Sequence, residues 1–122
     1  MEIIMKKILF FEGDAAAFIS GRKAALLRFS DNALTLSGVL AKDFTGMDAR
    51  SGFEQLKRFV SSASFEVIVL DGFAPALSVS SHKEDIIMWL NDHSSEPDFP
   101  TLLITGGGGE LLPGLNAEYY LK

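Results

Sequence analysis

Carboxylate, hydroxyl and ammonium side chains stand where the apolar runs of this sequence end. Glu12 and Asp14 follow one run, Asp71 a second and Thr105 a third, and Lys122 ends the last. Carboxylate oxygens are the ligands that Mg²⁺ prefers, whereas a hydroxyl and an ammonium group can contact phosphoryl oxygens. If the runs are parallel strands, their carboxyl ends meet at one edge of a sheet. The sequence then predicts a site for Mg²⁺, held by the three carboxylates, and for a phosphoryl group.

The elements that must position these side chains are strands alternating with helices. Strand-like segments, some of them continuous apolar runs, cover residues 8–11, 34–41, 65–71, 101–105 and 117–122. Asp14 is a good N-cap, and a helical spacing of apolar residues continues from there to Phe29. This alternation predicts an α/β fold with a parallel, doubly wound sheet and helices on both faces.

Two further helices are predicted from capping-box spacings. Ser51 and Glu54 form one box, and Ser81 and Glu84 form the other. The buried positions predicted for these helices are Phe53, Leu56 and Val60 in the first, and Ile86, Ile87 and Leu90 in the second. Residues 106–114, GGGGELLPG, are too rich in glycine for a good helix.

The overall composition is that of one globular domain of 122 residues, with 48% hydrophobic and 22% charged residues. A net charge of -5 without a basic cluster argues against direct binding of nucleic acid. The absence of cysteine excludes disulfides and thiolate metal sites and fits a reducing compartment. No segment has the roughly 20 apolar residues of a membrane helix, so we expect a cytoplasmic protein that does not contact membranes.

The sequence resembles the receiver domains of two-component response regulators. The similar segments are ILFFEGD, GFEQL, EVIVLDGFAP, PTLLITG and NAEYYLK, which follow one another in the order of that family. The resemblance implies a flavodoxin-like (CheY-like) sheet of five strands in the order 2-1-3-4-5. It also implies a degenerate fourth helix in residues 106–114 and a missing fifth helix. Residues 1–122 are then a receiver-like domain, the N-terminal part of a larger regulator.

The same resemblance implies a function for individual residues. Asp71 matches the acceptor of a phosphoryl group from a histidine kinase or a phosphotransfer protein. Thr105 and Lys122 match the pair that senses the phosphate, and Tyr119 matches the aromatic residue that switches with the threonine. The expected partners are an attached or separate effector domain, as in transcription regulation, and a second copy in a homodimer. Such a domain is a signalling module and not an enzyme.

Departures from the family pattern keep two other functions open. Gly13 stands where typical members carry a second acid that binds Mg²⁺ directly, which favours a pseudo-receiver that docks or dimerises without phosphorylation. The second alternative is a nucleic-acid enzyme of the Toprim type, because FFEGDAAAF resembles the strand-ending Glu-Gly of that family. That family also needs an Asp-x-Asp after a later strand, and here Asp71 is followed by Gly72 and Phe73.

Overall fold

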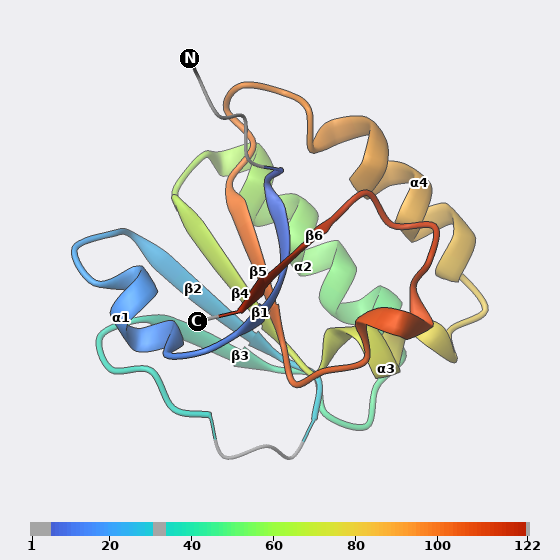
Figure 1. Cartoon of the computed structure of the whole chain (residues 1–122), viewed down its shortest axis with the longest axis horizontal. Helices are drawn as coiled ribbons and strands as arrows, with labels where there is room; N and C mark the ends of the chain where they lie inside the picture. Colours follow the sequence, from blue (N-terminus) through green and yellow to red (C-terminus); the bar gives the residue numbers. More distant parts are fainter. Residues whose placement is uncertain (1–5, 31–33, 122) are drawn as a thin grey trace.

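The computed structural model describes residues 6–30 and 34–121, and its centre is a parallel sheet (Figure 1). In the described residues the sheet has six strands: β1 (Ile8–Glu12), β2 (Ala24–Arg28), β3 (Leu40–Asp43), β4 (Val67–Asp71), β5 (Thr101–Thr105) and β6 (Glu118–Leu121). The helices are α1 (Ala15–Ile19), α2 (Ala49–Ser62), α3 (Phe73–Ser78), α4 (Lys83–His93) and the short 3-10 helix η1 (Gly109–Leu111). The predicted α/β class with a parallel sheet is confirmed.

The order of the strands differs from the prediction. The sheet runs β3-β2-β4-β5-β1-β6, with six strands in place of the predicted five in the order 2-1-3-4-5. The first strand therefore pairs with β5 on one side and β6 on the other, and β5 separates it from β4. The prediction was wrong because one strand was missed, and because pairing between residues far apart in the chain leaves no local signal in the sequence.

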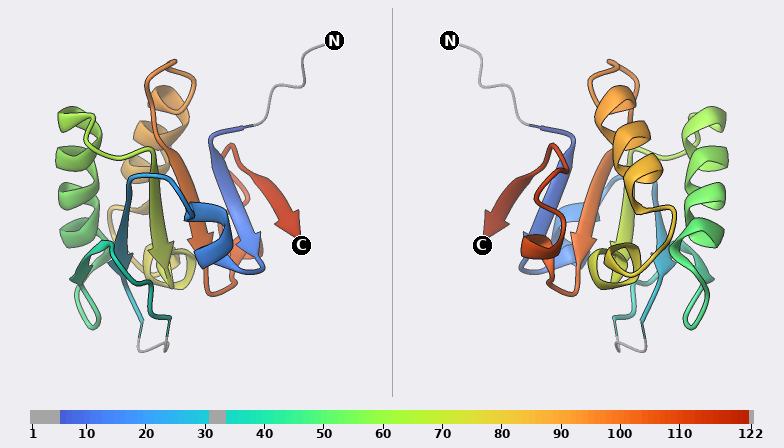
Figure 2. Two further views of the ribbon diagram at one scale, coloured as in Figure 1. Left: turned by 90° about the vertical axis from the view of Figure 1, so that its left-hand side faces the viewer. Right: turned by 90° about the vertical axis from the view of Figure 1, so that its right-hand side faces the viewer.

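Helices lie on both faces of the sheet, as a doubly wound fold requires. In Figure 2, α1 lies in front of the sheet in the left view and α4 lies in front in the right view. We call the face covered by α2, α3, α4 and η1 the α2 face, and its core includes Phe10, Leu27 and Ile104. The opposite α1 face is covered by α1 and by an irregular segment that contains Leu36.

The segment between Asp14 and Phe29 corrects the predicted helix. Only α1 is helical; Gly21 then turns the chain with a φ of 77°, and β2 follows. Ala25 and Leu27 are buried on the α2 face, whereas Ala24 and Leu26 are buried on the α1 face. Because β2 is apolar on both faces, the alternation of a strand is invisible in its sequence.

The predicted strand over residues 34–41 overlaps β3 at Leu40 and Ala41 alone. Leu34, Leu36 and Val39 instead pack against the α1 face as an irregular segment. The alternating leucines thus reflect contact with a sheet surface, which a coil can make as well as a strand. The strand in this region starts later, and all four residues of β3 are exposed at the edge of the sheet.

The predicted helices α2 and α4 are confirmed, but the capping boxes predicted to begin them, at Ser51 and Ser81, are wrong. Asp48 is the N-cap of α2 and accepts a hydrogen bond from the Arg50 amide, so the helix begins before Ser51. His82 is the N-cap of α4. The predicted apolar stripes do face the core, with Phe53, Leu56, Ile86 and Leu90 buried and Val60 and Ile87 partly buried against them.

The strands predicted over residues 65–71, 101–105 and 117–122 are confirmed as β4, β5 and β6. The glycine-rich segment after β5 forms only the short η1, as its composition predicts, while α3 was not predicted. In the described part of the chain, no helix has the length and apolar character needed to cross a membrane.

Candidate site at the carboxyl edge of the sheet

Three polar residues stand side by side at the carboxyl ends of the central strands. Arg28 of β2 is in register with Asp71 of β4, and Asp71 is in register with Thr105 of β5. Side chains alternate along a strand, and Val69 and Leu103, two residues earlier, are buried on the α1 face. Arg28, Asp71 and Thr105 therefore belong to the α1 face.

The Asp71 carboxylate is almost completely buried, with 2% of the residue exposed. The Thr105 hydroxyl donates a hydrogen bond of 2.8 Å to Asp71 Oδ1. Asp71 Oδ2 is buried and has no hydrogen-bond partner among the described residues. Leaving a buried acceptor unsatisfied costs about 1–3 kcal/mol, more for a charged group. The structure thus confirms that Asp71 and Thr105 lie together, and one buried carboxylate oxygen has no described hydrogen-bond partner.

The backbone on either side of Asp71 is held tightly. The Phe29 amide donates to the Asp71 carbonyl oxygen at 2.8 Å, and the Gly72 amide donates to the Thr105 carbonyl oxygen at 2.9 Å. Gly72 has a φ of 75°, and a Cβ there would lie 2.6 Å from Ser30 Cβ and Oγ. Glycine is therefore the residue that fits after Asp71, both for its backbone angle and for the space available.

At two places along this edge, the segments that follow two neighbouring strands lie on opposite faces of the sheet. After β4 and β5 it continues on the α2 face, into α3 and η1, whereas after β1 and β2 it continues on the α1 face. The adjacent pairs β2/β4 and β5/β1 are thus topological switch points. Ligands of open α/β sheets bind in the crevices at such points.

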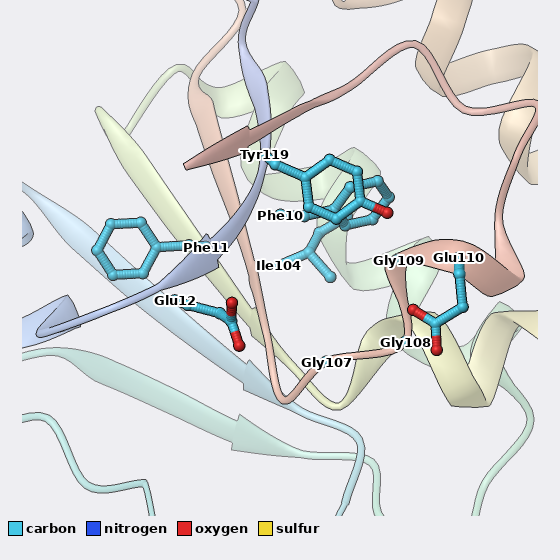
Figure 3. Close-up of a pocket in the computed structure, with 9 residues that line it drawn as sticks. All are labelled: Phe10, Phe11, Glu12, Ile104, Gly107, Gly108, Gly109, Glu110 and Tyr119. Atoms are coloured by element: carbon cyan, nitrogen blue, oxygen red, sulfur yellow. The ribbon is translucent and has the colours of Figure 1, made fainter. Parts of the chain in front are cut away.

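Two hollows open beside the β5/β1 switch point. The first, which we call the Asp71 hollow, is lined by Phe11, Glu12, Gly13, Ala15, Leu34, Asp71, Thr105, Gly106 and Gly107. The second, the Tyr119 pocket, has a volume of about 130 Å³ (Figure 3). It is lined by Phe10, Phe11, Glu12, Ile104, Gly107, Gly108, Gly109, Glu110 and Tyr119. The two hollows share Phe11, Glu12 and Gly107.

The three predicted Mg²⁺ ligands occupy different surroundings. Glu12 and Asp71 both line the Asp71 hollow, but β5 lies between their strands. Asp14 caps α1, where its Oδ1 accepts a hydrogen bond of 3.2 Å from the Ala17 amide. Among the described residues, no group of three or more His, Cys, Asp or Glu side chains is placed to hold a metal ion. Mg²⁺ binding by Glu12, Asp14 and Asp71 therefore stays a prediction.

The residue between the two acids has a structural reason to be glycine. Gly13 has a φ of 150°, a conformation that residues with side chains rarely adopt, at the turn from β1 into α1. A second carboxylate at this position would strain the turn.

Tyr119 and Thr105 do not share a face of the sheet. The Tyr119 ring packs against Phe10 with the ring centroids 5.1 Å apart, whereas Thr105 belongs to the α1 face. β1 also separates their strands, and Tyr119 is 63% exposed. Its predicted part as a switch with Thr105 would need coupling through β1 or through the loop after β5. Lys122, the other predicted phosphate-sensing residue, lies outside the described residues.

Sequence reasoning missed two charged residues of this edge. Arg28 was assigned to a helix, although it lies in β2 between Asp43 and Asp71 in register. Hydrogen bonds from Thr45 lower the pKa of Asp43, and the positive charge of Arg28 adds to that effect. Glu110 was hidden in the glycine-rich segment, and its only sequence signal is that it interrupts a strand-end loop otherwise free of charge.

The chain was compared with protein-family models, with curated proteins and with solved structures, and no match was found in any of the three comparisons.

Proposed function

We propose that this chain is a receiver-like signalling domain whose state is set at Asp71 and read by Thr105. The observation that carries the proposal is the 2.8 Å hydrogen bond from the Thr105 hydroxyl to the Asp71 carboxylate, on neighbouring strands at the carboxyl edge. A group added to the carboxylate would change the hydrogen bond that this hydroxyl donates. The five sequence segments that resemble receiver domains support the same function.

In the proposed reaction, a carboxylate oxygen of Asp71 attacks the phosphorus atom of a phosphohistidine. The new O–P bond makes an acyl phosphate, the P–N bond breaks, and its electron pair goes to the imidazole nitrogen. Asp71 Oδ2 is the oxygen suited to attack, because Oδ1 accepts the Thr105 hydrogen bond. The Thr105 hydroxyl can then donate to a phosphoryl oxygen, which stabilises the added charge.

The donor must reach a side chain that is 2% exposed, so the wall of the Asp71 hollow has to open. Gly106 and Gly107 form part of that wall, and their φ values are 90° and 77°. Such a loop lacks side chains that would hold it against the sheet. Because the three predicted ligands of Mg²⁺ are not gathered at one point, no step of this reaction is assigned to a metal ion.

The proposed output runs from Thr105 into the glycine loop that follows it. Movement of Thr105 would shift Gly107, which lines both hollows, and so alter the surface around Tyr119. A phosphoryl group is a local change of charge that biases a two-state element of this kind. The proposal includes a histidine kinase or phosphotransfer protein as donor, an effector domain as recipient and the cytoplasm as the location.

Incubation of the protein with acetyl phosphate, with and without Mg²⁺, tests the proposal by intact mass. We expect a mass increase of one phosphoryl group in the wild type and none in Asp71→Asn. Asp92→Asn, a substitution of an acid on α4, is the matched control and should be labelled like the wild type. Unlabelled wild-type protein under every condition, or equal labelling of Asp71→Asn, would refute phosphoryl transfer to Asp71.

The burial of Asp71 also favours a second candidate, a docking or dimerisation module that works without phosphorylation. In that case the carboxylate serves the fold, through Thr105, and the partner binds elsewhere. β3 and β6 are the two edges of the sheet, and an edge strand can pair with another chain. Light scattering separates the candidates: a dimer that persists in Asp71→Asn and ignores acetyl phosphate supports this module, and a strictly monomeric protein contradicts it.

A further inference from the structure

The Asp71 hollow and the Tyr119 pocket are neighbours that share three lining residues, and we call the two together the edge cleft. Glu12 lies at the junction, because it lines both hollows. In Figure 3 the carboxylates of Glu12 and Glu110 lie on opposite sides of the pocket, with Gly107 and Gly108 between them. The edge cleft thus has a carboxylate at each end, Asp71 and Glu110, and a third, Glu12, at its centre.

Every charged side chain among the described residues that line the edge cleft is a carboxylate. None of the described residues that line either hollow is lysine, arginine or histidine. The positive charge of Arg28 is in register with Asp71 on the neighbouring strand, but Arg28 is not among the described residues that line either hollow. A hollow lined by acids in a protein of net charge -5 concentrates cations and repels anions.

A second, independent observation points to a ligand that donates hydrogen bonds. Asp71 lines the cleft, its Oδ2 atom is buried, and no described residue donates to that atom. A buried carboxylate oxygen of this kind is stabilised by a charged donor such as an ammonium group. The oxygen is therefore suited to bind one end of a cationic ligand.

The other end of the cleft has an aromatic wall. Tyr119 is 63% exposed as a residue, and its ring packs against Phe10. Gly109 leaves room for this arrangement, since a Cβ there would lie 2.9 Å from the Tyr119 hydroxyl oxygen and 3.0 Å from Phe10 Cγ. An exposed aromatic face beside carboxylates is an environment that attracts ammonium groups.

We propose that the edge cleft binds a linear aliphatic polyamine. One ammonium group lies between Glu12 and Glu110 against the Tyr119 ring, and another donates to Asp71 Oδ2. The Tyr119 pocket has a volume of about 130 Å³, close to the roughly 150 Å³ of a cavity that binds benzene, which suits an ammonium group and a few methylenes. Asp71 and the Tyr119 ring lie on opposite faces of the sheet, and two strand spacings of ~4.8 Å separate the strands of Asp71 and Glu12, so the ligand is extended and passes over the carboxyl end of β5.

This inference does not rest on phosphoryl transfer. An amine bound at Asp71 competes with a phosphoryl donor for the same oxygen if both reach it. Spermidine binding is measured without any phosphoryl donor, and labelling of the wild type by acetyl phosphate is measured without amine. Either experiment can fail while the other succeeds.

The test is calorimetric titration with spermidine at physiological ionic strength. We expect saturable binding to the wild type and about tenfold weaker binding to Glu12→Gln and to Glu110→Gln, because each loses a charge-assisted hydrogen bond. Tyr119→Leu should also weaken binding, through loss of the aromatic face. Glu84→Gln is the matched control: it removes one negative charge from α4, outside both hollows, and should bind like the wild type.

Three results would overturn the proposal. The first is no saturable binding by the wild type. The second is equal weakening by Glu84→Gln and Glu12→Gln, which would mean that spermidine responds only to net charge. The third is equal affinity for butylamine, which carries one ammonium group and cannot bind at both ends of the cleft.

Discussion

Ser80 donates a hydrogen bond of 2.9 Å to Asp48 Oδ2, and so connects the N-terminus of α2 to the loop before α4. Asp48 is the N-cap of α2, and the same oxygen accepts from the Arg50 amide at 2.9 Å. The Ser80 hydroxyl oxygen in turn accepts from the His82 amide at 3.1 Å. One carboxylate therefore orders the starts of two helices on the α2 face.

The stability contributed by Asp48 should depend on pH. The hydrogen bond from the Arg50 amide, and then that from Ser80, lower the pKa of Asp48. The contribution is complete above the usual pKa of about 3.9 and is lost as the pH falls through the lower pKa of the folded protein. Asp48→Ala should therefore cost about 1 kcal/mol at neutral pH, and less at a pH of about 3.

Urea denaturation of wild type and variant at the two pH values measures this difference. Asp48→Asn keeps a capping side chain without the charge, so its difference from Asp48→Ala should change little with pH. A cost of Asp48→Ala that is the same at both pH values would contradict the prediction.

Thr105→Val should destabilise the fold by about 1–3 kcal/mol, since it removes the only described partner of the buried Asp71 carboxylate. Valine fits the space and suits a strand, so the loss should come from the hydrogen bond and not from packing. Thermal or urea denaturation measures the change. Thr105→Ser, which retains the hydroxyl, should recover most of the stability, and equal loss in both variants would show that packing dominates.

Gly52→Ala tests how closely α2 approaches the sheet. A Cβ at Gly52 would overlap two ring carbons of Phe29. Alanine favours a helix by about 1 kcal/mol over glycine, but overpacking a core costs about 1–3 kcal/mol. We expect net destabilisation in urea denaturation. Ser51→Ala, one residue earlier and exposed, is the control and should change stability by less than about 0.5 kcal/mol; a stabilised Gly52→Ala would contradict the close contact.

Gly72→Ala and Gly21→Ala compare two glycines with nearly the same backbone angle. Their φ values are 75° and 77°, but a Cβ at Gly72 would lie 2.6 Å from Ser30, whereas a Cβ at Gly21 would have open space. Gly21→Ala should cost about 1 kcal/mol for the backbone alone, and Gly72→Ala about 3 kcal/mol because a clash is added. Chemical denaturation measures both, and equal costs would show that the contact with Ser30 relaxes freely.

The parts of the fold that could be predicted from sequence are those with a local signal. β4 and β5 are continuous apolar runs ending in a polar residue, and their neighbouring ends bring Asp71 and Thr105 together as expected. β2 is also apolar on both faces, but the residues around it repeat at a helical spacing, so it was assigned to a helix. The position of β1 between β5 and β6 depends on contacts between distant residues, and no short segment of sequence encodes them.

The candidate site was predictable to the same extent. The acids and the hydroxyl at strand ends were found from their positions, but which of them meet depends on strand order. With β5 between β4 and β1, Glu12 contributes to the same hollow as Asp71 without standing beside it. The glycine loop and Glu110 join the site because β5 leaves the sheet toward the α2 face, which only the topology determines.

The pairing of β1 with β5 also has a consequence for how the chain is made. Ile8 lies opposite Leu102 in this pairing, and both are completely buried. During synthesis on the ribosome, the first strand therefore emerges long before its partners. Its apolar side chains cannot pair with β5 until residues 101–105 have been translated. We therefore expect closure of the sheet by β1 to be a late event of folding, after β2, β3 and β4 are able to pair.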